Sequence, residues 1–239
     1  MRKREARYVV TCEHGGNRVP PWLKNEFKGQ SALLASHRGW DAGALTLARR
    51  LADTLAAPLH YSTTSRLVVD LNRSAHHREV FSAITRKLDG ATRQRVLDAC
   101  YQPYREAVMA EIDAQVARGA RVIHLSAHSF VPRLNGVVRN ADVGFLYDPK
   151  RRREAQLCDA WARAVVAAAP ALRVRRNYPY RGSADGLTTA LRRRYPSAQY
   201  AGIEIELNQA LFEDAAAARR VVAVLCNVIA MGASHSSAT

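Results

Sequence analysis

Residues 121–127 read RVIHLSA, an apolar, β-branched run that is typical of a buried β-strand and that ends at His128 and Ser129. The sequence on either side of this run is helical in pattern, first over residues 91–118 and later over residues 152–169. Apolar runs of strand length that alternate with helical stretches are typical of layered α/β proteins. We therefore expect an α/β fold to which this run contributes a strand.

The same alternation continues along the rest of the chain. Further strands are predicted at residues 7–11, 59–62, 66–71 (RLVVDL), 143–147 and 200–207 (YAGIEIEL). Further helices are predicted at residues 41–56, 185–194 and 213–231, and Pro103 is expected to open a second helix within 91–118. Only residues 1–6 and 232–239 look loose, so we expect one folded domain over residues 1–239.

The composition is that of a folded protein without targeting segments. Hydrophobic residues make up 48% of the chain and charged residues 24%, with no low-complexity tract between them. The N-terminus lacks the apolar core of a signal peptide, and no uninterrupted apolar run approaches the roughly 20 residues of a membrane span. We expect a cytoplasmic protein that is not inserted in a membrane.

The net charge of +15 raises the alternative of a basic nucleic-acid-binding protein. The arginines cluster in short runs at residues 150–153, 173–176 and 192–194, without zinc-finger spacing, an aromatic RNA-binding motif or a glycine-rich phosphate loop beside them. We interpret the runs as solvated surface that also attracts an anionic substrate, and we expect no nucleic-acid partner.

Polar and ionisable residues stand at the ends of separate predicted strands, namely His14, Asn72-Arg73, His128 and Glu206. In open α/β sheets the strand ends converge on one crevice, where ligands bind. Two histidines and an acidic residue are a common set of zinc ligands, and a further glutamate can take a proton from the metal-bound water. The sequence therefore indicates a metal-dependent hydrolase.

Five motifs carry a resemblance to a known family: CEHGGNRVP at 12–20, DAGA at 41–44, SRLVVDLNRS at 65–74, SAHSF at 126–130 and YRGSADGLTTALRR at 180–193. Together they resemble the N-formylglutamate amidohydrolase family over almost the whole chain. The resemblance implies a three-layer αβα fold with a mixed central sheet, of the phosphorylase/hydrolase-like type found in zinc exopeptidases. It also implies hydrolysis of the amide of an N-acyl amino acid, with N-formylglutamate giving glutamate and formate.

The resemblance implies that His14 and His128 are the imidazole ligands of a zinc ion, although manganese, iron or cobalt would suit the same donors. Zinc carboxypeptidases carry His-x-x-Glu at the first ligand, whereas this chain has Asn17 at the fourth position. The third ligand is therefore open between Asp41, Glu13 and Asn17. The resemblance favours Asp41, and the alternative for Asp41 is to cap the helix that follows it.

The resemblance also implies the residues that bind and activate the substrate. Arg73, beside Asn72, would bind the substrate carboxylate with its planar guanidinium, and Asn17 and Arg181 are further candidates for substrate binding. Glu206 would be the general base, with Glu204 on the same strand face as its alternate. A family member that binds a small acid without cleaving it is the remaining alternative, because of Asn17.

Overall fold

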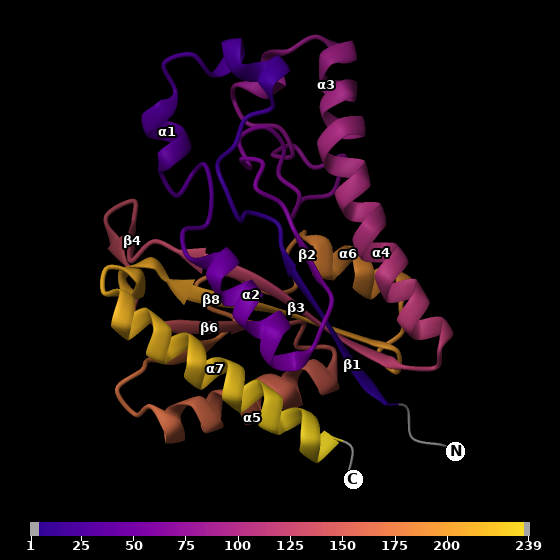
Figure 1. The fold of residues 1–239 in the computed structure, drawn as a ribbon, viewed down its shortest axis with the longest axis vertical. Helices are drawn as coiled ribbons and strands as arrows, with labels where there is room; N and C mark the ends of the chain where they lie inside the picture. Colours follow the sequence, from indigo (N-terminus) through magenta and orange to yellow (C-terminus); the bar gives the residue numbers. More distant parts are fainter. Residues whose placement is uncertain (1–4, 237–239) are drawn as a thin grey trace.

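The computed structural model describes residues 5–236 and contains a mixed sheet of six strands (Figure 1). In sheet order the strands are β2 (Leu59–Tyr61), β1 (Ala6–Cys12), β3 (Arg121–Phe130), β8 (Tyr200–Asn208), β6 (Val143–Leu146) and β7 (Val174–Arg176). The first four run parallel, β6 is antiparallel to β8, and β7 is parallel to β6. The expected α/β fold with a mixed central sheet is therefore confirmed.

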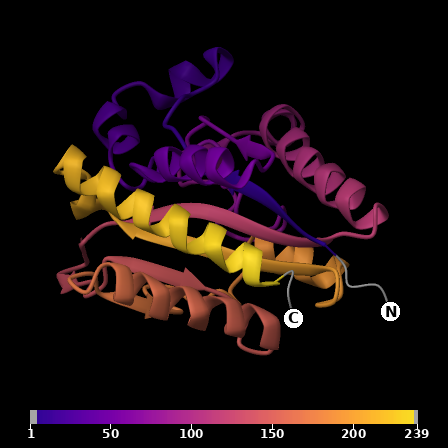
Figure 2. The same cartoon turned by 60° about the horizontal axis from the view of Figure 1, so that its bottom comes forward.

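Two sets of helices cover the two faces of the sheet, and Figures 1 and 2 show this layering. On one face, α2 (Ala44–Leu55), α5 (Arg152–Ala168) and α7 (Ala215–Ser236) bury alternate strand residues such as Val10, Ile123 and Ile205. On the other face, α4 (Gln102–Ala117) and α6 (Leu187–Arg194) pack against Val9 and Val122. Since side chains alternate along a strand, Glu13, His128, Glu204 and Glu206 belong to the face of α4 and α6.

Short elements complete the chain. They are η1 (Pro21–Phe27), α1 (Ser31–Ala35), η2 (Thr85–Lys87), α3 (Gly90–Val96), the π-helical turn η3 (Leu97–Tyr101), the hairpin of β4 (Arg133–Leu134) and β5 (Val137–Val138), and η4 (Gln209–Phe212). Figure 1 shows α3 and α4 as one continuous rod, because the π-helical turn joins them. Pro103 lies in the first turn of α4, but the predicted break at this residue is absent, because η3 runs into α4 without interruption.

The predicted strand at residues 66–71 is wrong. The segment forms turns, with hydrogen bonds from the Val68 N–H to the Ser65 carbonyl and from the Arg73 N–H to the Asp70 carbonyl. Its apolar side chains are buried in a second core that lies outside the sheet. The residues of that core that meet this segment are Leu23, Phe27, Val80, Val96 and Tyr101. This apolar run is therefore buried although it does not pair with a strand of the sheet.

The chain ends differ from the prediction in part. Ala6 already belongs to β1, and α7 continues to Ser236, so residues 232–236 are helical and not loose. Residues 1–4 and 237–239 of the predicted termini lie outside the described residues.

Helix α7 contains one stretch, Ala215–Gly232, that is long and apolar enough to cross a membrane by length and composition alone. This stretch is not an uninterrupted apolar run in the sequence, because Arg219 and Arg220 lie within it. One side of the stretch packs into the core between the sheet, α2 and α5. The buried residues are Ala218, Val221, Val222, Leu225, Cys226, Val228 and Ile229. One face of the helix therefore contributes to the core.

Candidate active site

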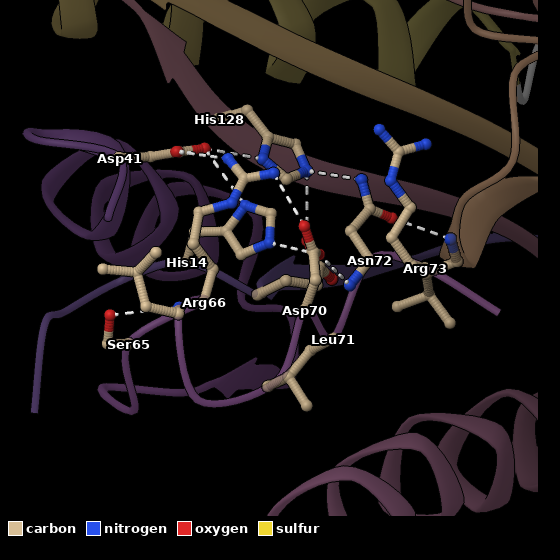
Figure 3. Close-up of polar contacts among 12 residues, drawn as sticks. His14, Asp41, Ser65, Arg66, Asp70, Leu71, Asn72, Arg73 and His128 are labelled. Atoms are coloured by element: carbon tan, nitrogen blue, oxygen red, sulfur yellow. Dashed lines mark hydrogen bonds and ion pairs between the residues drawn. The ribbon is translucent and has the colours of Figure 1, made fainter. Parts of the chain in front are cut away.

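The candidate site lies where the carboxyl ends of β1, β3 and β8 meet the loops that follow them (Figure 3). His14 is the second residue after β1, and His128 lies near the end of β3, paired in register with Glu206 on β8. Asp41 comes from the loop before α2, and its N–H donates a hydrogen bond to the His14 carbonyl at 2.9 Å. Parallel strand ends thus bring residues distant in sequence to one edge of the sheet, as expected.

His14, Asp41 and His128 form a buried cluster whose potential metal-ligating atoms all lie within 4.8 Å of one another. Oδ2 of Asp41 is 2.9 Å from Nδ1 of His128 and 3.4 Å from Nδ1 of His14. The alternative role of Asp41 as a helix cap is wrong: the N-cap of α2 is Gly43, and no side chain caps this helix. The Asp41 carboxylate faces the two imidazoles instead.

Gly43 makes the turn between Asp41 and α2 possible. Its φ of +83° is a conformation that L side chains rarely adopt, and a Cβ at this position would collide with the ring of Phe212 in η4. The glycine therefore fixes the path of the loop that presents Asp41.

Each imidazole of the cluster also meets a second acidic residue through its other nitrogen. Nε2 of His14 is 2.8 Å from Oδ1 of Asp70, and Nε2 of His128 is 3.2 Å from Oε2 of Glu13. Glu13 is fully buried and accepts hydrogen bonds from the Ser126 hydroxyl at 2.7 Å and the Tyr104 hydroxyl at 3.0 Å. Carboxylates behind metal-binding imidazoles commonly fix the tautomer and the orientation of the ring. Glu13 therefore supports His128 and does not join the cluster.

Arg66 connects the two aspartates of the site. Its guanidinium donates to Oδ1 of Asp41 at 3.3 Å and to Oδ2 of Asp70 at 2.8 Å. Burial by itself would raise the pKa of Asp41, but the cationic groups around it hold that pKa well below its ordinary value. The pKa of Asp70 is likewise held low, chiefly by Arg66 and His14 against the effect of burial. Both aspartates are therefore ionised at neutral pH.

Glu206 differs from every other acidic group at the site. It is 5% exposed, and its Oε2 is buried without a hydrogen-bond partner among the described residues. Burial raises the pKa of Glu206 to about 8, although the nearby His128 lowers it. Glu204, on the same face, is anchored by a hydrogen bond of 2.7 Å from the Thr188 hydroxyl. A buried carboxyl with an unused oxygen and a pKa near neutrality is suited to proton transfer.

A cavity of about 180 Å³ opens beside the cluster. Eight of the predicted site residues line it: His14, Asp41, Asn72, Arg73, His128, Arg181, Glu204 and Glu206. The Arg73 guanidinium is held by the Asp185 carbonyl at 2.9 Å, and Oδ1 of Asn72 accepts from the Leu187 N–H at 2.7 Å. Asn17 is exposed and does not line the cavity, so the structure does not bring it to the cluster.

Arg66 and Asp70 contact the cluster and were not predicted. Both lie in the SRLVVDLNRS motif, four positions apart, at the two ends of its apolar run. Burying an unpaired carboxylate is costly, so an aspartate at the end of a buried run was a signal that it has a charged partner. The arginine four residues earlier supplies that partner.

The fold and the site together define a layered α/β protein with a candidate metal centre at the carboxyl edge of its sheet. The profile of the N-formylglutamate amidohydrolase family matches residues 6–213, and the chain belongs to this family. This confirms the resemblance carried by the motifs. Membership makes the chain a hydrolase of the N-formylglutamate amidohydrolase type, a group of enzymes that act on amides.

Two solved structures are similar over nearly the whole chain. The gene product Atu2144 from Agrobacterium tumefaciens is 29% identical, with a TM-score of 0.81 over 94% of this chain and 90% of that one. N-formylglutamate amidohydrolase from Ralstonia eutropha JMP134 is 17% identical, with a TM-score of 0.69 over 98% of this chain and 95% of that one. The second likeness shows a shared fold. No curated protein matches the sequence.

Proposed function

We propose that this protein is a metal-dependent amidohydrolase that cleaves N-formylglutamate or a closely related N-acyl amino acid. The products are the free amino acid and the carboxylic acid of the acyl group. The observation that carries the proposal is the buried, unpaired oxygen of Glu206 beside the cluster of two histidines and an aspartate. Family membership supports the same reaction class.

The donor set fits a zinc ion. Two imidazole nitrogens and one carboxylate oxygen are typical of catalytic zinc sites, which keep a further position for water or substrate. We infer that His14, Asp41 and His128 would hold the ion, and manganese, iron or cobalt would suit the same donors. Bound there, the metal would lower the pKa of a water molecule and polarise the amide carbonyl.

The chain itself would move the proton. Glu206 would accept a proton from the attacking water and return it to the amine as the carbon–nitrogen bond breaks, so that one water and one amide yield formate and glutamate. Glu204 is the alternate base, but its hydrogen bond from Thr188 leaves it less free than Glu206. Asp70 and Glu13 would hold the two imidazoles in place.

Binding of the substrate would depend on the arginines of the cavity. Arg73 presents its guanidinium to the cavity while the Asp185 carbonyl holds one of its nitrogens, so it can pair with the α-carboxylate. Arg181 lines the same cavity and is exposed, so it would help to attract an anion.

The test is an assay of formate release from N-formylglutamate, with metal content measured on the same samples. Chelation should abolish activity, and added zinc should restore it. Glu206→Gln and His14→Ala should each lower kcat by at least about 100-fold, whereas His76→Ala, at an exposed histidine, should not. Unchanged rates in both site variants would refute the proposal. Binding of glutamate without any turnover would favour a non-catalytic family member instead.

A further inference from the structure

A second hollow adjoins the catalytic cavity and has a volume of about 350 Å³. The two hollows share lining residues, which are Asp41, Arg66, Ser129 and Tyr180. The second hollow extends from these residues to the end of β3 and the segment around Arg139. The two hollows therefore adjoin at Tyr180 and at Asp41 of the cluster.

Among the described residues, Arg139 is the buried cation of this hollow that has no carboxylate partner. Its side chain lies against two aromatic rings, with the guanidinium carbon 4.8 Å from the Tyr180 ring centre and 5.9 Å from that of Phe130. The residue is 9% exposed, and its backbone N–H donates to the Pro132 carbonyl at 2.8 Å. Within residues 5–232 no acidic side chain forms an ion pair with its guanidinium.

The other charged side chains of the hollow are in ion pairs, bonded to backbone carbonyls or exposed. Arg66 is paired with Asp41 and Asp70. Arg86 donates to the Arg78 and Phe81 carbonyls, and Glu79 lies 3.8 Å from Arg78. His37 and Arg38 also line the hollow, and the exposed Arg38 adds a positive charge to it. An arginine that is nearly buried and unpaired is costly to keep, unless a ligand supplies the anion.

We infer that the hollow at Arg139 binds a second carboxylate of the substrate, while Arg73 binds the first. The inference rests on the proposed function, because it assumes that the scissile amide lies at the cluster between the two hollows. The planar guanidinium can pair with a carboxylate through two hydrogen bonds while its face remains on Tyr180. Arg139 is thus a specificity-determining residue for acyl amino acids with two carboxylates.

The second carboxylate can belong to the amino-acid side chain or to the acyl group, and matched substrates separate the two sources. N-formyl-L-glutamate is compared with N-formyl-L-glutamine, and N-succinyl-L-glutamine with N-butyryl-L-glutamine. The enzymes compared are the wild type, Arg139→Met, Arg139→Lys and Arg118→Met. Arg118→Met removes one positive charge from an exposed position outside both hollows.

Within one of the two pairs, we expect the wild type to prefer the member that carries the second carboxylate. The pair that shows this preference identifies whether that carboxylate belongs to the side chain or to the acyl group. Arg139→Met should lower kcat/KM for that member about 10- to 100-fold and leave its neutral counterpart within two-fold. Arg139→Lys should retain part of the preference, and Arg118→Met all of it. Equal rates for both members of both pairs in the wild type would overturn the inference without any variant. An equal effect of Arg139→Met on both members would also overturn it.

Failure of the proposed function can be distinguished from failure of the inference about Arg139. If the wild type cleaves none of the four compounds, calorimetric binding of L-glutamate and L-glutamine to the zinc-loaded protein tests the hollow directly. A preference for glutamate that Arg139→Met abolishes would support the inference. Equal affinities for the two amino acids, together with equal affinities for N-succinyl-L-glutamine and N-butyryl-L-glutamine, would overturn it.

Discussion

Oδ2 of Asp41 lies 2.9 Å from Nδ1 of His128, although the two residues are 87 positions apart in the sequence. The same oxygen faces Nδ1 of His14. Asp41 is thus the point at which the loop before α2 and the end of β3 meet, and it supplies the only negative charge among the three proposed ligands.

Replacing Asp41 should therefore weaken metal binding more than it weakens the fold. Asp41→Asn keeps the shape of the side chain but removes its charge, and we expect the affinity for zinc to fall at least about 100-fold. Competition with a chelating dye measures this affinity. Asp53→Asn, on the exposed side of α2, is the matched control. Equal zinc affinity in the two variants would exclude Asp41 as a ligand.

Glu13 should act on the metal through His128. Glu13→Gln can still accept hydrogen bonds from Ser126 and Tyr104, but it no longer offers a carboxylate to Nε2 of His128. We expect the zinc affinity to fall about 10- to 100-fold while the thermal unfolding temperature of the chelator-treated protein changes little. Glu106→Gln, an exposed position on α4, should change neither quantity. A zinc Kd within two-fold of wild type would show that Glu13 does not position His128.

Glu206 should limit the stability of the metal-free protein above acidic pH. Its folded-state pKa is raised to about 8 from 4.5. The protonated form is therefore favoured by folding, and stability is lost as the pH rises from about 4.5 through 8. Glu206→Gln mimics the protonated form, so its Tm should match wild type near pH 4.5 and exceed it by several degrees at pH 8. A constant difference in Tm across this range would contradict the argument.

His124 should make the protein less stable as the pH falls, whereas Glu206 makes it less stable as the pH rises. Its ring lies between the hydroxyls of Thr11 and Tyr200, and burial lowers its pKa from 6.5 to about 4. Folding thus favours the neutral ring, so stability is complete above pH 6.5 and is lost as the pH falls towards 4, by about 3 kcal/mol. Urea unfolding at a series of pH values measures this loss. His124→Gln should show a shallower slope between pH 6.5 and 4, and a parallel curve would assign the sensitivity to another group.

The strands that carry the site were predictable because their patterns are local. RVIHLSA and YAGIEIEL are strand-like over their own lengths, and alternation alone places Glu204 and Glu206 on one face. The chemistry at the strand ends follows from topology, since parallel strands deliver their last residues to one edge.

The segment RLVVDL was not predictable in the same way. A short continuous apolar run is compatible with a strand, a buried helix or a buried loop, and only its packing partners decide among them. Those partners, such as Phe27 and Tyr101, lie far away in the sequence. The salt bridges of Arg66 with Asp41 and Asp70 depend on this loop conformation. They could not be predicted from the sequence, because the loop conformation itself could not.

The register between β3 and β8 pairs His128 with Glu206. Because successive residues of a strand point to opposite faces, deleting one residue of β8 before Glu204 would turn Leu207 towards the cluster and send both glutamates into the apolar layer of α5 and α7. Deleting two residues would return the side chains to their original faces, but it would displace the Glu206 carboxylate by about 7 Å along the strand. The number of residues within β8 is thus under a parity constraint, and insertions should be accepted only before β8 begins.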